Sequence, residues 1–165
     1  MLLFAECSIL CILFTFMVLP AQYKDPLALI MSYPPAIIKR VEQLPEYQGM
    51  IKQREHSHIK KKLFGVFLFV AVLSLVAYCS GCRTFLAAFI HVFVLFMVVN
   101  LYDLLILDWG IACHSKKLRI PGTEDMEKEY KDYLFHLKGA CKGMIIGTVV
   151  AVLSGCVISV ITLLV

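Results

Sequence analysis

The sequence is short of charge and contains long stretches without any. Charged residues make up 17% of the 165 residues and hydrophobic residues 60%, whereas a soluble domain is typically about a quarter charged and about half apolar. The chain also lacks an internal repeat and any low-complexity segment, which excludes repeat architectures and disordered chains. Residues 1–165 therefore predict a single integral membrane domain.

The motifs of common enzyme classes are also missing. The sequence has no G-x-S-x-G nucleophile turn, Walker loop, dinucleotide fingerprint or kinase element. His56, His58, Cys113, His114 and His136 offer metal-ligating atoms, but their spacing matches no zinc-finger or zincin pattern, and solvated loop histidines are the simpler interpretation. Basic residues alternate with acidic ones, which argues against a nucleic-acid partner. The sequence accordingly predicts no catalytic residue, no metal and no cofactor.

Four apolar blocks are present, each close to the roughly 20 residues that a helix needs to cross the hydrocarbon of a bilayer. They are Leu2–Leu19, Leu63–Cys82, Thr84–Leu107 and Cys141–Val165. No Lys or Arg precedes Tyr23, so the first block lacks the basic region of a signal peptide. We interpret it as a retained span, with cleavage after "LPAQ" as the alternative. The blocks predict an all-α membrane protein, a four-transmembrane-helix bundle.

The basic residues predict the orientation of this bundle. Fifteen of the sixteen Lys and Arg residues fall in residues 21–62 and 109–142, and Arg83 is the exception. Basic loops stay on the cytoplasmic side of a membrane. We therefore expect an integral protein of the cell (cytoplasmic) membrane, with loops 21–62 and 109–140 cytoplasmic and both termini outside.

Each of these loops contains an amphipathic pattern. In the first, one helical face carries Ile37, Ile38, Val41 and Leu44, between Pro35 at the start and Pro45 at the end. In the second, Thr123 is a plausible N-cap, and the apolar face consists of Met126, Tyr130, Tyr133, Leu134 and Leu137. Two interfacial helices on the cytoplasmic surface are expected. The first serves either as a connector or as a docking surface for a partner or a lipid headgroup, and the second is expected to run into the fourth span or to bend into it near Gly139.

The fourth block has the clearest periodicity in the sequence. Small residues recur at strict four-residue intervals: Gly139, Gly143, Gly147, Ala151, Gly155 and Ser159. Small residues let helix backbones approach closely in a membrane, where apolar burial between helices gains little. The stripe predicts small-xxx-small packing against another helix. That helix belongs either to this chain, which we favour, or to a second copy.

Polar residues in the third block form a candidate polar site of Asn100, Tyr102, Asp103 and His91. Asp103 lies near the inner edge of the predicted span. It either pairs with one of the three lysines at 60–62 or lines a water-accessible cavity with Asn100 and Tyr102.

The other polar residues near these spans are interpreted separately from Asn100, Tyr102 and Asp103. In an α-helix, Asp108 would point roughly 140° away from Asp103, so the two acids form no obvious pair. His91 lies opposite Asn100 and suits an interhelical hydrogen bond or a proton relay. Glu6 is either buried in the outer turn of the first span or marks its outer end, and we favour the second interpretation.

The second and third blocks are joined by "CSGCR", which is too short for anything but a tight hairpin with its turn at Gly81. Cysteines at the outer mouth of this predicted hairpin form a candidate redox site. Cys79 and Cys82 are followed by Arg83, and a cation beside a C-x-x-C pair lowers the thiol pKa and favours thiol–disulfide exchange. With four spans, this resembles the quinone-linked disulfide oxidases of the disulfide-bond-B and vitamin-K-epoxide-reductase type. The resemblance implies a second outward cysteine pair, which could be supplied only by Cys7 and Cys11. The alternative is that cysteine suits tight helix packing.

Three functions follow as expectations. The first is a non-enzymatic subunit, scaffold or regulator of a membrane assembly, whose partners are the lipid bilayer and a membrane protein or a second copy. The second is a small-solute or ion transporter component that uses Asn100 and Asp103. The third is a membrane thiol–disulfide oxidoreductase that uses Cys79 and Cys82.

Overall fold

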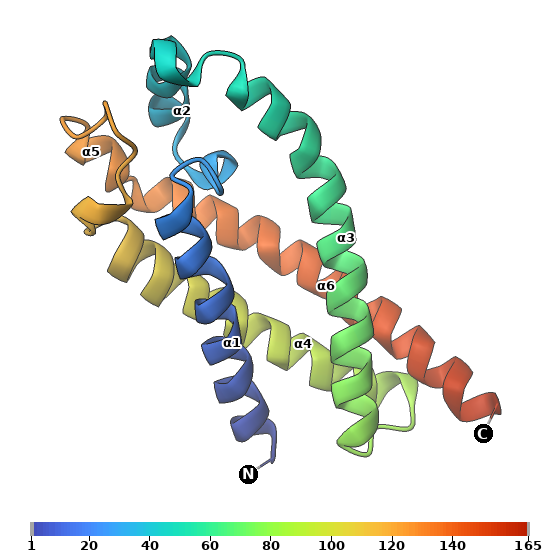
Figure 1. The fold of residues 1–165 in the computed structure, drawn as a ribbon. Coiled ribbons are helices and arrows are strands. Elements are labelled where there is room, and N and C mark those ends of the chain that lie inside the picture. The colour runs from blue at the N-terminus through green and yellow to red at the C-terminus, as the bar shows by residue number, and fades with distance from the viewer. Residues whose placement is uncertain (1, 165) are drawn as a thin grey trace.

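A computed structural model describes residues 2–164, except for the side chains of residues 56–59 and 61. The histidines at 56 and 58 therefore lie outside the described side chains. Four long helices dominate the fold (Figure 1): α1 (Leu2–Lys24), α3 (Met50–Cys79), α4 (Phe85–Tyr102) with its π-helical continuation η3 (Asp103–Ala112), and α6 (Tyr133–Leu164). Each contains a stretch long and apolar enough to cross a membrane, which agrees with the four blocks of the sequence.

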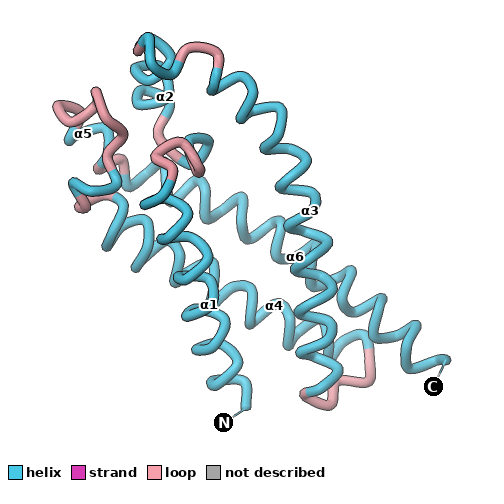
Figure 2. The backbone as a smooth tube through the Cα atoms, in the orientation of Figure 1, coloured by secondary structure: helices cyan, strands magenta, loops and turns pink. Residues whose placement is uncertain are grey.

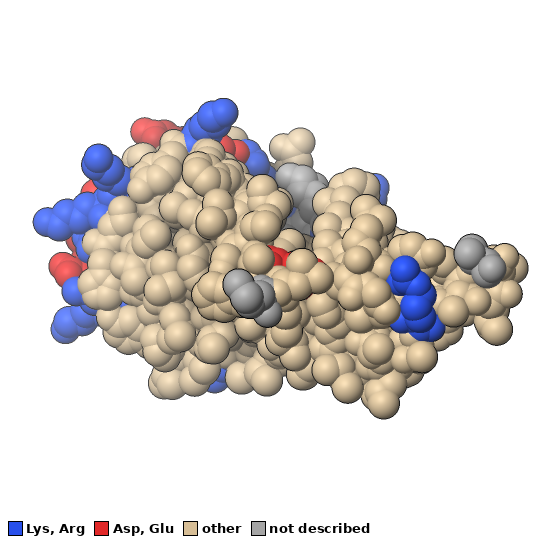
Figure 3. Space-filling model, turned by 90° about the horizontal axis from the view of Figure 1, so that it is seen from below, with Lys and Arg blue, Asp and Glu red and all other residues tan. Residues whose placement is uncertain are grey.

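The long helices pack around α4, which contacts α1, α3 and α6, while α3 also contacts α6. Their shared core contains two buried residues from each of α3, α4 and α6: Leu73, Ala77, Val92, Leu95, Val150 and Ala151. Large apolar side chains cover much of the remaining helix surface. Viewed from below in Figure 3, the surface is mostly uncharged, and charged residues gather toward one side.

Helices α4 and α6 approach closely at the small residues of α6. A Cβ atom at Gly147 would clash with Phe96, and one at Gly155 would lie 2.8 Å from two ring atoms of Phe85. Ala151 lies between them and is fully buried. Gly139 differs, because a Cβ there would meet nothing within 4 Å. The close approach of α4 and α6 therefore uses the middle of the stripe.

Loops occupy the two ends of the long helices (Figure 2). We call the end with the α3–α4 connection the turn end. Gly81 adopts a φ of +88° there, and the Thr84 side chain caps α4 by accepting a hydrogen bond of 3.3 Å from the Ala87 amide. A left-handed residue between "CS" and "CR" is what so short a connection requires, as the sequence predicts.

The opposite end, which we call the loop end, carries five short helices. These are η1 (Ile30–Ser32), α2 (Pro35–Gln43), η2 (Pro45–Tyr47), η4 (Lys116–Leu118) and α5 (Glu127–Tyr130). Together the loops enclose a second apolar core of Leu27, Ile30, Tyr33, Ile37, Val41, Ile51, Ile120 and Tyr130. Pro35 begins α2 as predicted. However, the buried residues on the apolar face of α2 pack against other parts of the chain and not against a membrane surface. The second loop folds over the first and supplies Ile120 and Tyr130 to this contact.

The predicted second amphipathic helix is wrong in its extent. Thr123 caps no helix; its hydroxyl is buried, donates to the Ile120 carbonyl at 2.7 Å and lies 2.7 Å from the Tyr130 hydroxyl. Only the single turn of α5 forms before the chain breaks. Asp132 then caps α6 by accepting a 3.0 Å hydrogen bond from the Phe135 amide. The fourth long helix consequently begins at Tyr133 and runs without a break through Gly139 into the apolar block that starts at Cys141.

Candidate functional site: a buried polar junction at the loop end

The junction begins with an unusual backbone segment. Residues Asp103–Ala112 form a π-helix of 10 residues, whereas most π-helical segments are single turns, frequently at functional sites. A π-helix needs roughly one more residue per turn than an α-helix, so positions five apart return to nearly the same side. Asp103 and Asp108 are consequently close enough for their charges to interact. The expected angle of roughly 140° between Asp103 and Asp108 assumes α-helical geometry, which this segment does not have.

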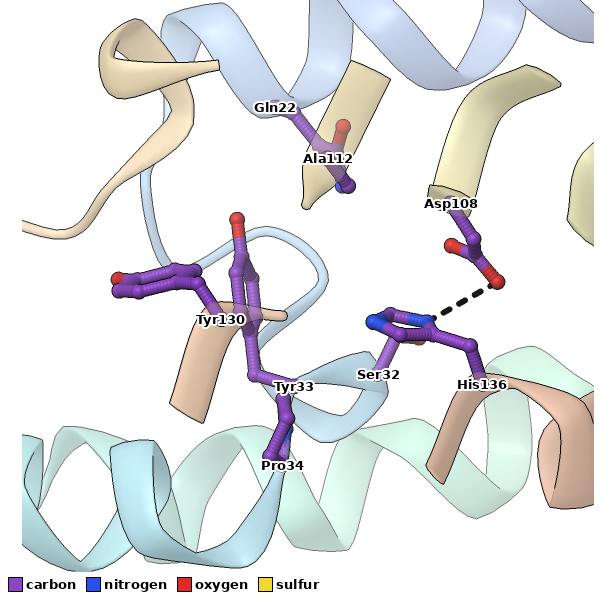
Figure 4. A pocket seen from close by; sticks show the side chains of 8 residues that line it. All are labelled: Gln22, Ser32, Tyr33, Pro34, Asp108, Ala112, Tyr130 and His136. Carbon is purple, nitrogen blue, oxygen red and sulfur yellow. Dashed lines mark ion pairs between the residues drawn. The ribbon is translucent and has the colours of Figure 1, made fainter. Parts of the chain in front are cut away.

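Asp108 meets a histidine from the first turn of α6. His136 Nδ1 lies 3.1 Å from Asp108 Oδ2, and Figure 4 shows the two side chains directed at each other. The His136 side chain is only 7% exposed, whereas that of Asp108 is 30% exposed. Asp132 positions the imidazole by fixing the start of α6. The carboxylate thus selects the imidazole form that has a proton on Nδ1.

A small pocket lies beside this pair. Its volume is about 20 Å³. The residues that line it come from both loops and from the adjoining ends of the long helices: Gln22, Ser32, Tyr33, Pro34, Asp108, Ala112, Tyr130 and His136 (Figure 4). A volume of roughly 10–15 Å³ is enough for one water molecule. The pocket can therefore accommodate a water beside a carboxylate and an imidazole, but it is too small for an organic substrate.

The two tyrosines of the pocket fix its walls. The Tyr33 hydroxyl donates to the Leu118 carbonyl at 3.0 Å, and the Tyr130 hydroxyl accepts from the Ile120 amide at 2.9 Å. Their rings meet edge to face at 5.8 Å. Burial raises the pKa of the Tyr33 phenol above its usual range, so Tyr33 stays protonated at neutral pH. The tyrosines are hydrogen-bonded to backbone and hold the two loops together.

The residues of the predicted polar site point to different helices. Asn100 Nδ2 donates to the Ala140 carbonyl of α6 at 3.1 Å, and the Tyr102 hydroxyl lies 2.9 Å from Thr15 Oγ1 of α1. Among the described side chains, Asp103 makes no ion pair with a lysine, and Lys61, one of its predicted partners, lies outside them. The charged neighbours of Asp103 are Asp108 and His136.

His91 belongs to a separate polar group at the turn end. Its Nε2 lies 2.9 Å from Glu6 Oε2, and both side chains are largely buried. The two atoms are close enough for an ion pair without meeting the geometry of a hydrogen bond. The Ser80 hydroxyl donates to the other Glu6 oxygen. Glu6 therefore links α1 to two other helices, which corrects its interpretation as a simple end marker.

The cysteines of the predicted redox site are free thiols, Cys79 exposed and Cys82 half-buried. Burial raises the pKa of Cys82, with a further increase from Glu6 that outweighs the opposite effect of Arg83. The guanidinium of Arg83 instead lies 3.9 Å from the centre of the Tyr78 ring. The lowering expected from Arg83 is outweighed at Cys82 chiefly by burial and then by Glu6 of α1, and the local sequence shows neither of these two effects.

No family model, curated protein or solved structure matches this chain. Among the described residues, no three His, Cys, Asp or Glu side chains form a group that could hold a metal ion.

Sequence reasoning missed the Asp108–His136 pair. The two residues are 28 positions apart, and their meeting depends on the π-helix and on the early start of α6. Asp132 followed by an apolar run was the available signal for that start.

Proposed function

We propose that this chain is a non-catalytic subunit, scaffold or regulator of a larger membrane assembly. The observation that supports it most is the use of polar groups in the long helices. Asn100, Tyr102, Glu6 and Asp108 each connect two helices, and the pocket beside Asp108 has room for water alone. These groups specify how the helices pack, which is the requirement of a scaffold. We further propose that the loop end faces the cytoplasm, because it carries nearly all the basic residues.

Helix α1 supplies the surface for the proposed partner. None of its described residues is buried, because α4 is its main neighbour among the long helices. Leu2, Ile9 and Phe16 follow each other at seven-residue intervals and are 60%, 56% and 72% exposed. Seven residues are close to two helical turns, so the three side chains form one ridge. An apolar ridge of this kind fits against a helix of another membrane protein.

The test is photo-crosslinking in native membranes from a crosslinking amino acid placed at Phe16. Ile145 of α6 is the matched control, because it is 68% exposed and lies outside the ridge. We expect a discrete protein adduct from position 16 and none from position 145. Lipid adducts alone at both positions, or equal protein adducts from both, would contradict the proposal. Differently tagged copies of the chain distinguish a second copy from another protein.

A second candidate function is the movement of protons or a small cation. The observation that favours it is the pairing of an acid with an imidazole at each end, Glu6 with His91 and Asp108 with His136. The Thr15–Tyr102 contact lies between these pairs along α1 and α4. In reconstituted vesicles Asp108→Asn should then abolish flux, whereas Asp125→Asn on the exposed loop should not. Undiminished flux in Asp108→Asn would exclude the Asp108–His136 pair from a transport path.

A further inference from the structure

Helices α1 and α3 are linked at both ends. At the turn end, Ser80, which follows α3, donates a hydrogen bond to Glu6 of α1. At the loop end, Arg54 of α3 forms a 2.6 Å ion pair with Asp25, which directly follows α1. These polar links hold the two helices beside each other at a fixed separation.

Between the links, the two helices are separated by an apolar hollow. A cavity of about 180 Å³ lies there, and its 11 lining residues, from α1, α3 and α4, are all apolar. Leu95 of α4 closes its floor and is fully buried, whereas Leu13 and Val72 on its walls are 59% and 42% exposed. The hollow is therefore a window that opens sideways, and Figure 1 shows α1 and α3 well separated in this region. A void without partner atoms forfeits dispersion contacts, so the window favours an apolar occupant.

Two lysines lie above the window on the side of the loop end. Lys24 follows the lining residue Met17 by seven positions, and Lys62 precedes the lining residue Phe69 by seven. Seven residues place each lysine on the same helix face as its lining residue and roughly 10 Å nearer the loop end. Both lysines are exposed. Neither takes part in the ion pairs formed among the described residues.

We infer that this window binds one acyl chain of an anionic phospholipid, whose phosphate is held between Lys24 and Lys62. Basic pockets between membrane helices on the side of the basic loops are suited to anionic headgroups, and the apolar hollow below continues the site at the depth of an acyl chain. The inference concerns a lipid ligand and does not depend on the proposed assembly partner.

The end links disfavour a protein helix that lies lengthwise in the hollow. A partner helix running along α1 and α3 is roughly 10–12 Å wide with its side chains, and it would have to pass both the Glu6–Ser80 and the Asp25–Arg54 contacts. An acyl chain ends within the bilayer and enters the window from the side. A lipid therefore fits the hollow with both links intact.

The test is native mass spectrometry of the full chain in detergent, with phosphatidylglycerol and phosphatidylcholine of the same acyl chains. We expect one phosphatidylglycerol to be retained in preference. A basic residue near an anionic headgroup strengthens binding roughly fivefold, so the double variant Lys24→Gln/Lys62→Gln should lose the preference by roughly twenty- to thirtyfold. The control Lys138→Gln/Lys142→Gln removes the same charge from exposed positions of α6 and should keep it.

A third variant tests the acyl chain separately from the headgroup. Val72→Phe fills the window and should reduce the retention of both lipids, with helix content and elution volume unchanged; Leu13→Phe does the same from α1 if Val72→Phe misfolds. Equal retention of the two lipids by the native chain would overturn the inference. An equal loss of the phosphatidylglycerol preference in the two double-lysine variants would also overturn it. Full lipid retention by Val72→Phe would do the same.

Discussion

The close approach of α4 and α6 predicts that Gly147→Ala destabilises the fold while Gly139→Ala does not. A Cβ at Gly147 would clash with Phe96 and lie 2.7 Å from Met97 Cε, whereas a Cβ at Gly139 would meet nothing within 4 Å. Both changes replace glycine inside the same helix, so both gain roughly 0.5–1 kcal/mol of helix propensity. The difference in unfolding free energy between the two variants therefore measures the cost of added volume in a packed interface, which is roughly 1–3 kcal/mol.

The assay is reversible unfolding in mixed micelles of increasing denaturing detergent, followed by helix content. Relative to the native chain, we expect Gly139→Ala to be slightly more stable, and Gly147→Ala to fall below Gly139→Ala by about 1–3 kcal/mol. Gly147→Leu should enlarge the loss, because Phe96 and Met97 would have to leave the interface. Equal stabilities of Gly139→Ala and Gly147→Ala would refute the contact between the α6 stripe and α4.

Three other substitutions test separate contacts. Asp132→Ala removes the cap of α6 and should cost about 1 kcal/mol of unfolding free energy, whereas loss of Asp125, which caps no helix, should cost nothing measurable. Asn100→Leu removes the hydrogen bond to the Ala140 carbonyl and should lower the unfolding free energy by about 0.6 kcal/mol in the same assay. A variant that is more stable than the native chain would contradict this prediction. Thr123→Val leaves the buried Tyr130 hydroxyl short of a partner, which should cost about 1–3 kcal/mol and speed proteolysis of the loop end, and unchanged proteolysis would count against that contact.

Local signals in the sequence predicted the elements that depend on local chemistry. The apolar blocks marked the four long helices, Pro35 marked the start of α2, and the short connection around Gly81 required a turn. Each of these follows from hydrophobic length or from the φ preference of one residue. A local pattern also predicts close helix packing along α6, because glycines every four residues leave a groove on one helix face.

Contacts between distant segments were not accessible in the same way. Glu6 and His91 meet only because α1 and α4 run side by side, and Asp108 reaches His136 only because η3 is π-helical. The apolar face of α2 was recognisable, but its cover was not, since Ile120 lies in an irregular loop without periodicity. In the sequence, the apolar side chains that form the interior of the loop end therefore have the same helical spacing as apolar side chains that would lie on a membrane surface.

The π-helix also makes the loop end sensitive to the length of the chain. A π-helical turn is an α-helical turn with roughly one additional residue, so a single-residue deletion within Asp103–Ala112 would allow that turn to return to α-helical geometry. Unless the turn makes that change, a deletion between Asp103 and Asp108 would move Asp108 by one position around the helix, roughly 80–100°, and Asp108 would leave His136. A deletion that removes no polar side chain would in this way separate the two elements that Asp108 and His136 connect, which makes residue count in this segment as specific a requirement as residue identity.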